Sequence, residues 1–336
     1  MTNKENAELF RKEWLEGKPA FSIKTSGSTG VPKVIEIRRE QMIASAKKTI
    51  QALDLQNGMT SLVCLDVNFI AGKMMIVRSL IAGMNMIVVE PAADPFEDIP
   101  DTRIDFAALV PYQLTEALKS PHQMRNVGKI ILGGAPLSSE LLDDVRQLPV
   151  SCYATFGMTE TITHIALQKL NGADKQDYFQ ILDGVTISTD DRGCLVIDAD
   201  YLDDVIVTND LVDLVDDRRF RWLGRYDNVI NSGGVKVIPE KVEQAIGKWL
   251  SANGFDNKFF VTGTPHDRLG TQVVLVVEGW IFKETEEKLL AGIKELLAKY
   301  EIPRKVMYTN SFAYTPTGKV DRKVSLENAL PRPSGR

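Results

Sequence analysis

The densest group of phosphate-binding residue types lies in one short segment near the start of the chain. Residues 25–33 read Thr-Ser-Gly-Ser-Thr-Gly-Val-Pro-Lys. Hydroxyl and backbone N–H groups donate hydrogen bonds to phosphate oxygens, glycines let the backbone approach closely, and lysine adds a charge-assisted bond. A flexible linker is the alternative, but the segment lies between two strand-like runs, and its spacing is not that of a Walker loop. The candidate phosphate-binding residues are Thr25, Ser26, Gly27, Ser28, Thr29, Gly30 and Lys33.

Two further segments carry residue types that suit a nucleotide site. Residues 133–137 read Gly-Gly-Ala-Pro-Leu after an apolar run, and residues 153–161 read Tyr-Ala-Thr-Phe-Gly-Met-Thr-Glu-Thr. The first is also typical of an ordinary strand-to-helix turn. The second would also suit a helix start with a threonine cap and a first-turn glutamate. Taken singly, neither segment decides between ligand binding and these structural roles.

Four more segments toward the C-terminus combine acidic, basic and glycine residues. They are Val207-Thr-Asn-Asp-Leu211, Trp222-Leu-Gly-Arg-Tyr-Asp-Asn228, Ser232-Gly-Gly-Val-Lys-Val-Ile-Pro-Glu240 and Thr315-Pro-Thr-Gly-Lys-Val320. The third would also suit a turn before a helix that begins at Pro239, although this leaves the paired glycines unexplained. Lys319 in the fourth could, by itself, be a solvated lysine in a turn.

In this order, the segments resemble the signatures of the adenylate-forming superfamily, which includes acyl-CoA synthetases, luciferases and nonribosomal adenylation domains. The resemblance extends from about Phe21 to Lys319. It implies a ligase that joins a carboxylic acid to AMP and then passes the acyl group to coenzyme A, with ATP and Mg²⁺. Two anions meet in the first step, so the site must supply positive charge and alignment rather than a protein nucleophile.

The resemblance also implies a role for individual residues. Lys33 would act in catalysis, Thr159 would contact the α-phosphate, and Glu160 would bind Mg²⁺, which prefers carboxylate and phosphate oxygens. Lys319 would enter the site for adenylation. The remaining nucleotide-binding residues would be Gly133, Gly134, Ala135 and Pro136 along the adenine, Phe156 stacked near it, Gly157, and Asp210 and Arg225 at the ribose. Asn209 stands where the family usually has a glycine.

Asp227 would be the hinge between two domains, a large ATP- and acid-binding domain at residues 1–226 and a mobile C-terminal domain at residues 227–336. Rotation about the hinge would withdraw Lys319 and bring in Gly233 and Gly234 for the reaction with coenzyme A.

The identity of the acid rests on softer segments, which resemble the bacterial o-succinylbenzoate-CoA ligases of menaquinone biosynthesis in a form shortened at the N-terminus. These segments are Leu109-Val-Pro-Tyr-Gln-Leu114, Thr163-His-Ile-Ala166 and Asn228-Val-Ile-Asn-Ser-Gly-Gly234. An aromatic dicarboxylate needs an apolar wall and a hydrogen-bond donor. Candidates by position are Phe69, Gly72, Lys73, Tyr112 and His164. His164 could equally make a structural hydrogen bond at a helix start. Because Phe69 replaces a histidine common in the family, a stacking or gating role cannot be carried over to it.

The surrounding pattern predicts an α/β fold that could position these segments. Apolar runs at 61–65, 86–90, 106–110 and 129–132 alternate with amphipathic stretches at 40–53, 72–82, 111–118 and 138–148, which predicts a largely parallel sheet covered by helices. Short strands at 186–188, 194–197, 205–208 and 220–223 predict a small β subdomain. A helix at 239–250, a strand at 271–278, a helix at 283–299 and a strand at 304–309 predict a compact C-terminal α+β domain.

Composition narrows the class of partner. A formal net charge of −5 gives no reason to expect nucleic acid or an anionic membrane surface. Cys64, Cys152 and Cys194 lie far apart without metal-ligand spacing, which predicts the reducing cytoplasm. No signal-peptide or membrane-spanning pattern is found. Association with a second copy of the chain stays open, since a missing N-terminal subdomain would leave surface to cover.

Three alternatives to this assignment remain. The first is another aryl-acid or fatty-acid CoA ligase, although a long acyl chain would need a deep apolar tunnel. The second is a non-catalytic adenylate-binding module, against which the presence of Glu160, Arg225 and Lys319 argues. The third is a carrier-loading adenylation domain, which would normally stand beside a carrier domain.

Overall fold

The computed structural model describes residues 1–24, 34–97, 99, 102–120, 123–255, 257–314 and 320–331. The predicted phosphate-binding segment at 25–33 and the predicted catalytic Lys319 therefore lie outside the described residues. The strands on either side of that segment, β1 (Ala20–Lys24) and β2 (Val34–Arg38), pair antiparallel with Lys24 opposite Val34.

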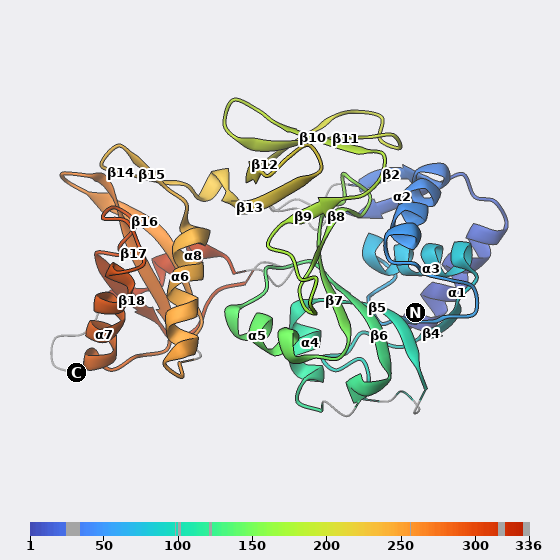
Figure 1. The fold of residues 1–336 in the computed structure, drawn as a ribbon, viewed down its shortest axis with the longest axis horizontal. Helices are drawn as coiled ribbons and strands as arrows, with labels where there is room; N and C mark the ends of the chain where they lie inside the picture. The colour runs from blue at the N-terminus through green and yellow to red at the C-terminus, as the bar shows by residue number, and fades with distance from the viewer. Residues whose placement is uncertain are drawn as a thin grey trace.

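Five parallel strands form one half of an 11-stranded sheet, in the spatial order β7-β6-β5-β3-β4 (Figure 1). They are β3 (Thr60–Val63), β4 (Asn85–Val88), β5 (Ile104–Leu109), β6 (Val127–Leu132) and β7 (Ser151–Gly157). Successive residues of β5 alternate between two buried clusters, with Phe106 and Ala108 in one and Ala107 and Leu109 in the other. Both faces of this half are therefore covered, as expected of parallel strands.

Helices supply these covering layers. They are α1 (Asn3–Leu15), α2 (Arg39–Ala52), α3 (Ile70–Ala82), α4 (Pro111–Ala117) and α5 (Ser139–Gln147), with a short 3₁₀ turn η1 (Gln123–Asn126). Sequence explains their ends: Thr2 and Glu5 form a capping box at α1, and the Ser138 hydroxyl accepts from the Leu141 N–H at α5. Helix α3 ends at Gly83, whose φ of 71° suits glycine.

The other half of the same sheet is antiparallel and continues from β7 in the order β8-β9-β13-β12-β11-β10. The strands are β8 (His164–Lys169), β9 (Phe179–Ile181), β10 (Val185–Thr189), β11 (Cys194–Ala199), β12 (Ile206–Leu214) and β13 (Arg219–Arg225). The predicted short strands are present, but they do not form a separate subdomain. Strand β8 pairs with both β7 and β9 and so joins the two halves by continuous hydrogen bonding.

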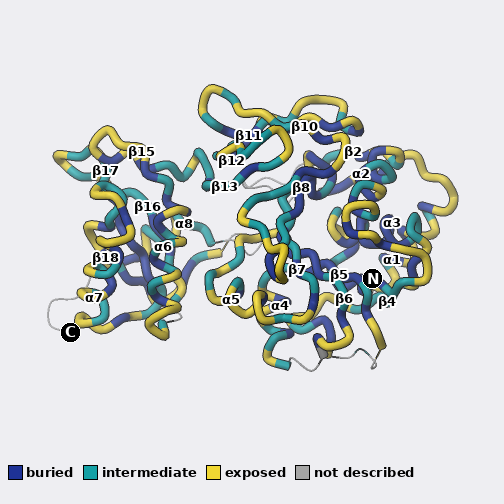
Figure 2. Tube along the Cα trace, viewed as in Figure 1, coloured by how far each residue is buried: buried dark blue, intermediate teal, exposed yellow. Residues whose placement is uncertain are grey.

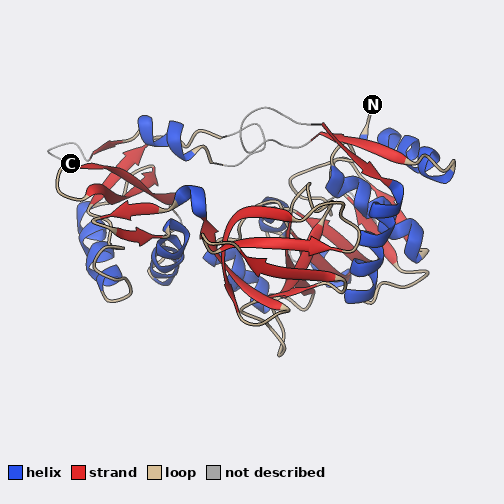
Figure 3. Ribbon diagram, turned by 90° about the horizontal axis from the view of Figure 1, so that it is seen from above, coloured by secondary structure: helices blue, strands red, loops and turns tan. Residues whose placement is uncertain are grey.

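A second, six-stranded sheet lies in the C-terminal part of the chain, beside the large sheet (Figures 1 and 3). After the 3₁₀ turn η2 (Tyr226–Asn228) come β14 (Ile230–Ser232), β15 (Val235–Val237), α6 (Pro239–Ala252), β16 (Phe259–His266), β17 (Gly270–Glu278), α7 (Lys283–Lys294), β18 (Lys305–Thr309), α8 (Arg322–Glu327) and β19 (Leu330–Pro331). Helix α7 is shorter than the predicted 283–299, because its end tightens into a 3₁₀-type bond from Leu296 N–H to the Ile293 carbonyl.

Buried residues follow the strands of both sheets (Figure 2). The two clusters of the large sheet contain no residue beyond Phe220, and the two C-terminal clusters begin at Ile230. The two parts meet through α6. A Cβ added at Gly247 would lie 2.9 Å from the Ser139 hydroxyl of α5, so the absence of a side chain there lets the helices approach closely. The described residues thus confirm the predicted α/β class.

Candidate active site

Two of the predicted segments meet at the carboxyl ends of neighbouring parallel strands. Residues 133–136 follow β6, and residues 156–160 lie at the end of β7. A Cβ at Gly133 would lie 2.5 Å from the Thr155 hydroxyl, which donates to the Leu132 carbonyl (3.0 Å). The glycine is therefore required for the close approach of the turn to β7. Ligands of open parallel sheets bind at such strand ends.

The loop that carries Thr159 and Glu160 is held in an unusual backbone conformation. The buried Thr161 hydroxyl accepts from the Met158 N–H (3.0 Å) and donates to the Thr163 carbonyl (2.7 Å). Ile162 has φ of 69°, which costs about 1–3 kcal/mol for a non-glycine residue. Because such strain persists only where the surroundings impose it, this loop is a preferred position for function.

Glu160 is exposed on this loop, and its carboxylate makes no hydrogen bond or ion pair with the described residues. No group of three or more metal-binding side chains is found in the part of the chain that the structure describes. Mg²⁺ is usually held by one or two carboxylates together with substrate phosphates, so one free carboxylate is what the predicted role of Glu160 requires, and that role stays a prediction.

Phe156 precedes this loop on β7 and packs in an aromatic cluster. Its ring makes edge-on contacts with Phe220 (5.1 Å between centroids) and Phe179 (5.7 Å), which are themselves stacked. Next to it, a Cβ at Gly157 would lie 2.4 Å from the His164 Cα, so only glycine fits where β7 bulges against β8. The aromatic neighbours fix the Phe156 ring, and its stacking on adenine stays a prediction.

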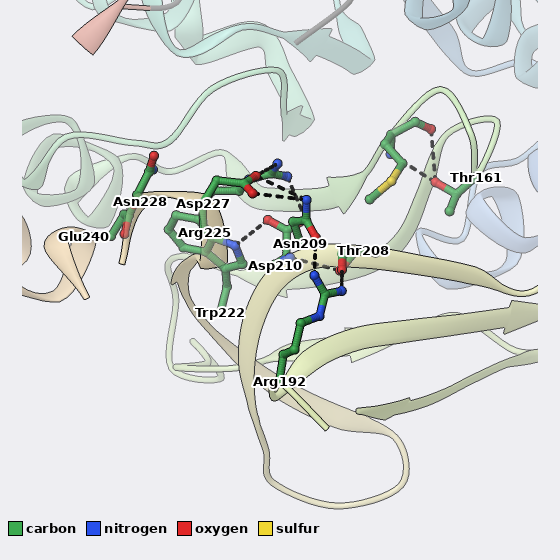
Figure 4. A network of polar contacts seen from close by, with 11 residues as sticks. Thr161, Arg192, Thr208, Asn209, Asp210, Trp222, Arg225, Asp227, Asn228 and Glu240 are labelled. Carbon is green, nitrogen blue, oxygen red and sulfur yellow. Dashed lines mark hydrogen bonds and ion pairs between the residues drawn. The ribbon is translucent and has the colours of Figure 1, made fainter. Parts of the chain in front are cut away.

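Asp210 and Arg225 lie directly opposite each other on β12 and β13. Asp210 is buried, and its carboxylate accepts from Trp222 Nε1 (2.9 Å) and from an Arg225 Nη atom (3.4 Å; Figure 4). Arg225 also donates to the carboxylate of Asp227 (2.9 Å). Strand pairing thus brings Asp210 and Arg225 together from two separate segments, and hydrogen bonds link both Asp210 and the neighbouring Asp227 to Arg225.

Asn209 extends this network, although the resemblance had suggested only a departure from glycine. Its Nδ2 donates to Asp227 (3.2 Å), and its Oδ1 accepts from Arg192 Nη1 (2.9 Å; Figure 4). Arg192 also donates to the Thr208 carbonyl. No motif marked Arg192, because it lies in the turn between β10 and β11 and reaches Asn209 only through the pairing of β11 with β12.

His164 is buried and begins strand β8, so the predicted helix start is wrong. Its Nε2 lies 3.0 Å from the Thr49 hydroxyl and its Nδ1 lies 3.3 Å from the Thr163 hydroxyl. Burial, with a smaller contribution from the Arg78 charge, lowers the imidazole pKa well below its ordinary value of 6.5. His164 is therefore neutral at physiological pH and takes part in a structural hydrogen-bond pair, while contact with the acid stays a prediction.

Arg78 was not predicted as a functional residue. It is only 2% exposed and pairs with no carboxylate among the described residues. Its Nη2 donates to the Thr163 hydroxyl (2.7 Å), and its Nε is buried without a described partner. Burial lowers the guanidinium pKa to about 9, so it is still charged at neutral pH. The signal in the sequence was its place as the one charge in the apolar run Met74–Ala82 of α3.

Among the other candidates for the acid pocket, Lys73 and Tyr112 line two different cavities. The Lys73 Nζ donates to the Val67 carbonyl (2.6 Å) and lies over the Phe10 ring of α1, in a cavity of about 330 Å³. Burial lowers its pKa. Tyr112 is 62% exposed and lines a different cavity, also of about 330 Å³.

The remaining two candidates lie at the start of α3. Phe69 precedes the helix and is half exposed. A Cβ at Gly72 would lie 2.5 Å from the Asp66 carbonyl, so close packing of the chain alone explains why this residue is a glycine. The grouping of these residues around one acid therefore stays a prediction.

The two glycines assigned to the coenzyme A step form the turn between β14 and β15, with φ values of 60° at Gly233 and 82° at Gly234. These values lie in the left-handed region, which explains both glycines without a ligand. Gly233 packs near Leu269 and Tyr300, whereas no atom of the described residues, apart from the two chain neighbours, lies within 4 Å of a Cβ added at Gly234. The turn is therefore open at its second glycine.

The buried imidazole predicts a dependence of stability on pH. Because the folded state lowers the pKa of His164, its contribution is fully present above the unfolded value near 6.5 and is lost as pH falls below it, by up to about 1.4 kcal/mol per pH unit. Urea unfolding between pH 7.5 and 5.5 should show this decline, and His164→Gln should flatten it. His266→Gln is the control and should keep the wild-type slope. Parallel curves for wild type and His164→Gln would contradict a neutral buried imidazole.

Known proteins resemble this chain in sequence. Residues 3–192 match the family model described as AMP-binding enzyme. The 2-succinylbenzoate-CoA ligase of Listeria monocytogenes is 26% identical over 349 residues, covering 96% of this chain and 72% of the Listeria enzyme. No helix among the described residues is long and apolar enough to cross a membrane.

Two solved structures share the fold. An acyl-CoA synthetase (AMP-forming)/AMP-acid ligase II-like protein from Dyadobacter fermentans is 38% identical, with a TM-score of 0.65, covering 96% of this chain and 93% of that chain. The o-succinylbenzoate CoA synthetase of Bacillus subtilis, in complex with its acyl-adenylate intermediate, has a TM-score of 0.76 at 22% identity, covering 93% of this chain and 69% of that chain. The second likeness is one of fold.

Proposed function

The chain belongs to the family of AMP-binding enzymes, and from this premise we propose that it is an AMP-forming acid–thiol ligase. It uses ATP to convert a carboxylic acid into an acyl-adenylate and then transfers the acyl group to coenzyme A. The observation that carries the proposal is the meeting of the Gly133 turn with the strained loop of Thr159 and Glu160 at adjacent strand ends. The buried Asp210, already held by Trp222 and Arg225, adds a ribose site.

In the first step the chain's task is to bring two anions together. Asp210 accepts from the ribose hydroxyls, and Arg225 directs its guanidinium toward the ribose and phosphate. Glu160 would hold Mg²⁺, which would supply charge neutralisation at the triphosphate. Thr159 donates to the α-phosphate from the same loop. The acid's carboxylate oxygen forms a bond to the α-phosphorus while the bond to the pyrophosphate oxygen breaks.

In the second step the coenzyme A thiolate attacks the acyl carbon and AMP leaves. We propose that the boundary between residues 226 and 227 separates the two domains that rearrange between the steps. Asp227 is the hinge, and the open turn at Gly234 faces coenzyme A after the rearrangement. The described contacts of Asp227 with Arg225 and Asn209 would have to adjust during that motion.

The acid is, in our proposal, o-succinylbenzoate, the substrate named for the Listeria relative. Support from the molecule itself comes from Arg78, a buried cation without a carboxylate partner in the described chain, hydrogen-bonded to Thr163 beside the Glu160 loop. A buried charge is costly unless it is paired. A substrate with a second carboxylate would provide that pair, which an aliphatic or simple aryl acid would not.

A panel of acids tests the substrate. Pyrophosphate release should be fastest with o-succinylbenzoate, slower with benzoate and octanoate, and thioester should form only when coenzyme A is added. Equal release with all three acids would reject the dicarboxylate assignment while leaving the ligase class intact. No release with any acid would favour a non-catalytic adenylate-binding module.

Replacing Arg78 should alter selectivity for the second carboxylate. For Arg78→Met we expect kcat/KM for o-succinylbenzoate to fall about 10- to 50-fold relative to benzoate, the worth of one or two charge-assisted hydrogen bonds. Arg78→Lys should retain part of the preference. Arg221 on β13, which pairs with Asp177 and Asp213 at the surface, is the control, and Arg221→Met should leave the ratio unchanged. Equal losses on both acids for Arg78→Met would assign Arg78 a structural role.

The cellular setting forms part of the proposal. Cys64, Cys152 and Cys194 are all free and buried, and burial raises the pKa of the first two thiols to about 12. Such thiols are unreactive and suit a cytoplasmic enzyme whose partners are small molecules.

A further inference from the structure

The segment that carries Lys319 is bracketed by residues that bind each other. Tyr314 and Val320, on either side of residues 315–319, form an antiparallel bridge. The Asp321 N–H donates to the Ala313 carbonyl (2.8 Å), and the Ala313 N–H donates to the fully buried Ser325 hydroxyl (2.9 Å). Residues 313–314 and residues 320–325, which include the first part of α8, are therefore joined by hydrogen bonds. We call these two segments the limbs.

Arg322 attaches the limbs to helix α6. Its guanidinium makes a bidentate ion pair with Glu243, with both N···O distances at 3.0 Å, and donates to the Val261 carbonyl (3.1 Å). The same carboxylate accepts from the Val261 N–H (2.7 Å), so it is held from two sides. Burial raises the pKa of Glu243, and the Arg322 charge opposes that shift. Bidentate pairs of this kind fix orientation as well as adding energy.

Helix α6 in turn sets the place of the C-terminal part against the large sheet. Glu240, one turn before Glu243, accepts from Asn228 Nδ2 (2.6 Å) beside the proposed hinge (Figure 4). Its other carboxylate oxygen packs closely against Gly224 of β13, since a Cβ added at Gly224 would lie 2.3 Å from that oxygen. The chain of contacts therefore runs from the hinge through α6 and Arg322 to the limbs on either side of Lys319.

We propose that Arg322, acting through Glu243, is a positioning residue for acyl-adenylate formation. It fixes the segments on either side of residues 315–319 relative to helix α6, and adenylate formation, the step assigned to Lys319, depends on that placement. This inference rests on the proposed ligase function and on the role of Lys319 in it. Because Lys319 is withdrawn for the thioester step, the effect of Arg322 is confined to the first half-reaction.

The test measures the two half-reactions separately in Arg322→Met and Glu243→Gln. The glutamine variant keeps the shape of Glu243 and its bond to Val261, which guards against a folding defect. Pyrophosphate release with o-succinylbenzoate should fall about tenfold, because small misplacements of a catalytic group are costly. Thioester formation from synthetic o-succinylbenzoyl-adenylate and coenzyme A should stay within about twofold. Arg322→Lys should recover part of the loss.

Helix α6 offers a matched control. Lys241 makes an ion pair with Glu301 (2.9 Å) on the same helix but without contact to the limbs, and Lys241→Met should leave both half-reactions unchanged. Parallel losses in both half-reactions of Arg322→Met and Glu243→Gln, or no loss in either, would overturn the inference.

Hydrogen–deuterium exchange separates this inference from the proposed function. Exchange in peptides spanning 313–325 should rise in Arg322→Met and stay unchanged in the large sheet, whatever reaction the protein catalyses. If exchange rises but the wild type forms no adenylate, the ligase function fails. If the wild type forms adenylate and neither exchange nor adenylation changes in the variants, the positioning role fails.

Discussion

Replacing Lys319 with alanine is expected to lower the rate of acyl-adenylate formation by about 10²–10³-fold, the loss typical of removing one preorganised group from an electrostatic site. The first step joins a carboxylate to a triphosphate, and the proposed role of Lys319 is to offset the charge that accumulates as they meet. Thioester formation from supplied adenylate should stay within about twofold, because the lysine is proposed to leave the site before that step.

Lys323 provides the control for this substitution. It is exposed on α8, four residues after Lys319 in the sequence, so Lys323→Ala removes a positive charge from a nearby position in the chain. Both half-reactions should be unaffected in the control. If Lys319→Ala slowed the two half-reactions equally, or left adenylate formation intact, the assigned role would be wrong.

Glu160→Gln is expected to reduce kcat/KM for adenylate formation on the order of 10²-fold or more, since a correctly placed divalent cation contributes several kcal/mol to the transition state. The glutamine preserves the size of the side chain and the loop locked by Thr161, and it removes only the negative charge. The variant should also need a higher Mg²⁺ concentration for half-maximal rate, which a Mg²⁺ titration of pyrophosphate release would show.

Glu140, exposed in the first turn of α5, is the matched control for that charge. Glu140→Gln should keep the wild-type rate and the wild-type Mg²⁺ dependence. A Glu160→Gln enzyme with an unchanged Mg²⁺ requirement would place the cation on other groups.

Much of the fold could be predicted because its signals are local. Apolar runs located β3 to β6, and caps such as Ser138 located the ends of helices. Strand β16 was missed because Phe259–His266 contains a glycine and a proline, which usually argue against a strand. The joining of two half-sheets through β8 depends on pairing between distant segments, and periodicity carries no information on such pairing.

The residues of the candidate site also differ in whether the sequence could reveal them. Asp210, Arg225 and Asp227 were found by resemblance; strand pairing explains why Asp210 meets Arg225, and Asp227 lies two residues after Arg225 in the chain. Arg78 and Arg192 carry no motif, since their importance comes from burial in one case and from a cross-strand bond in the other. The alternative that placed His164 at a helix start is wrong, because this residue begins β8, which pairs antiparallel with β7.

Transfer of an oxygen atom tests the central claim most directly. The wild-type protein is incubated with ATP, Mg²⁺, coenzyme A and o-succinylbenzoate whose carboxylates carry ¹⁸O, and the products are analysed by mass spectrometry. Attack of the carboxylate on the α-phosphorus predicts that each AMP released carries one ¹⁸O atom, in step with acyl-CoA formation. Formation of ADP with ¹⁸O in inorganic phosphate, or acyl-CoA with unlabelled AMP, would contradict an acyl-adenylate intermediate.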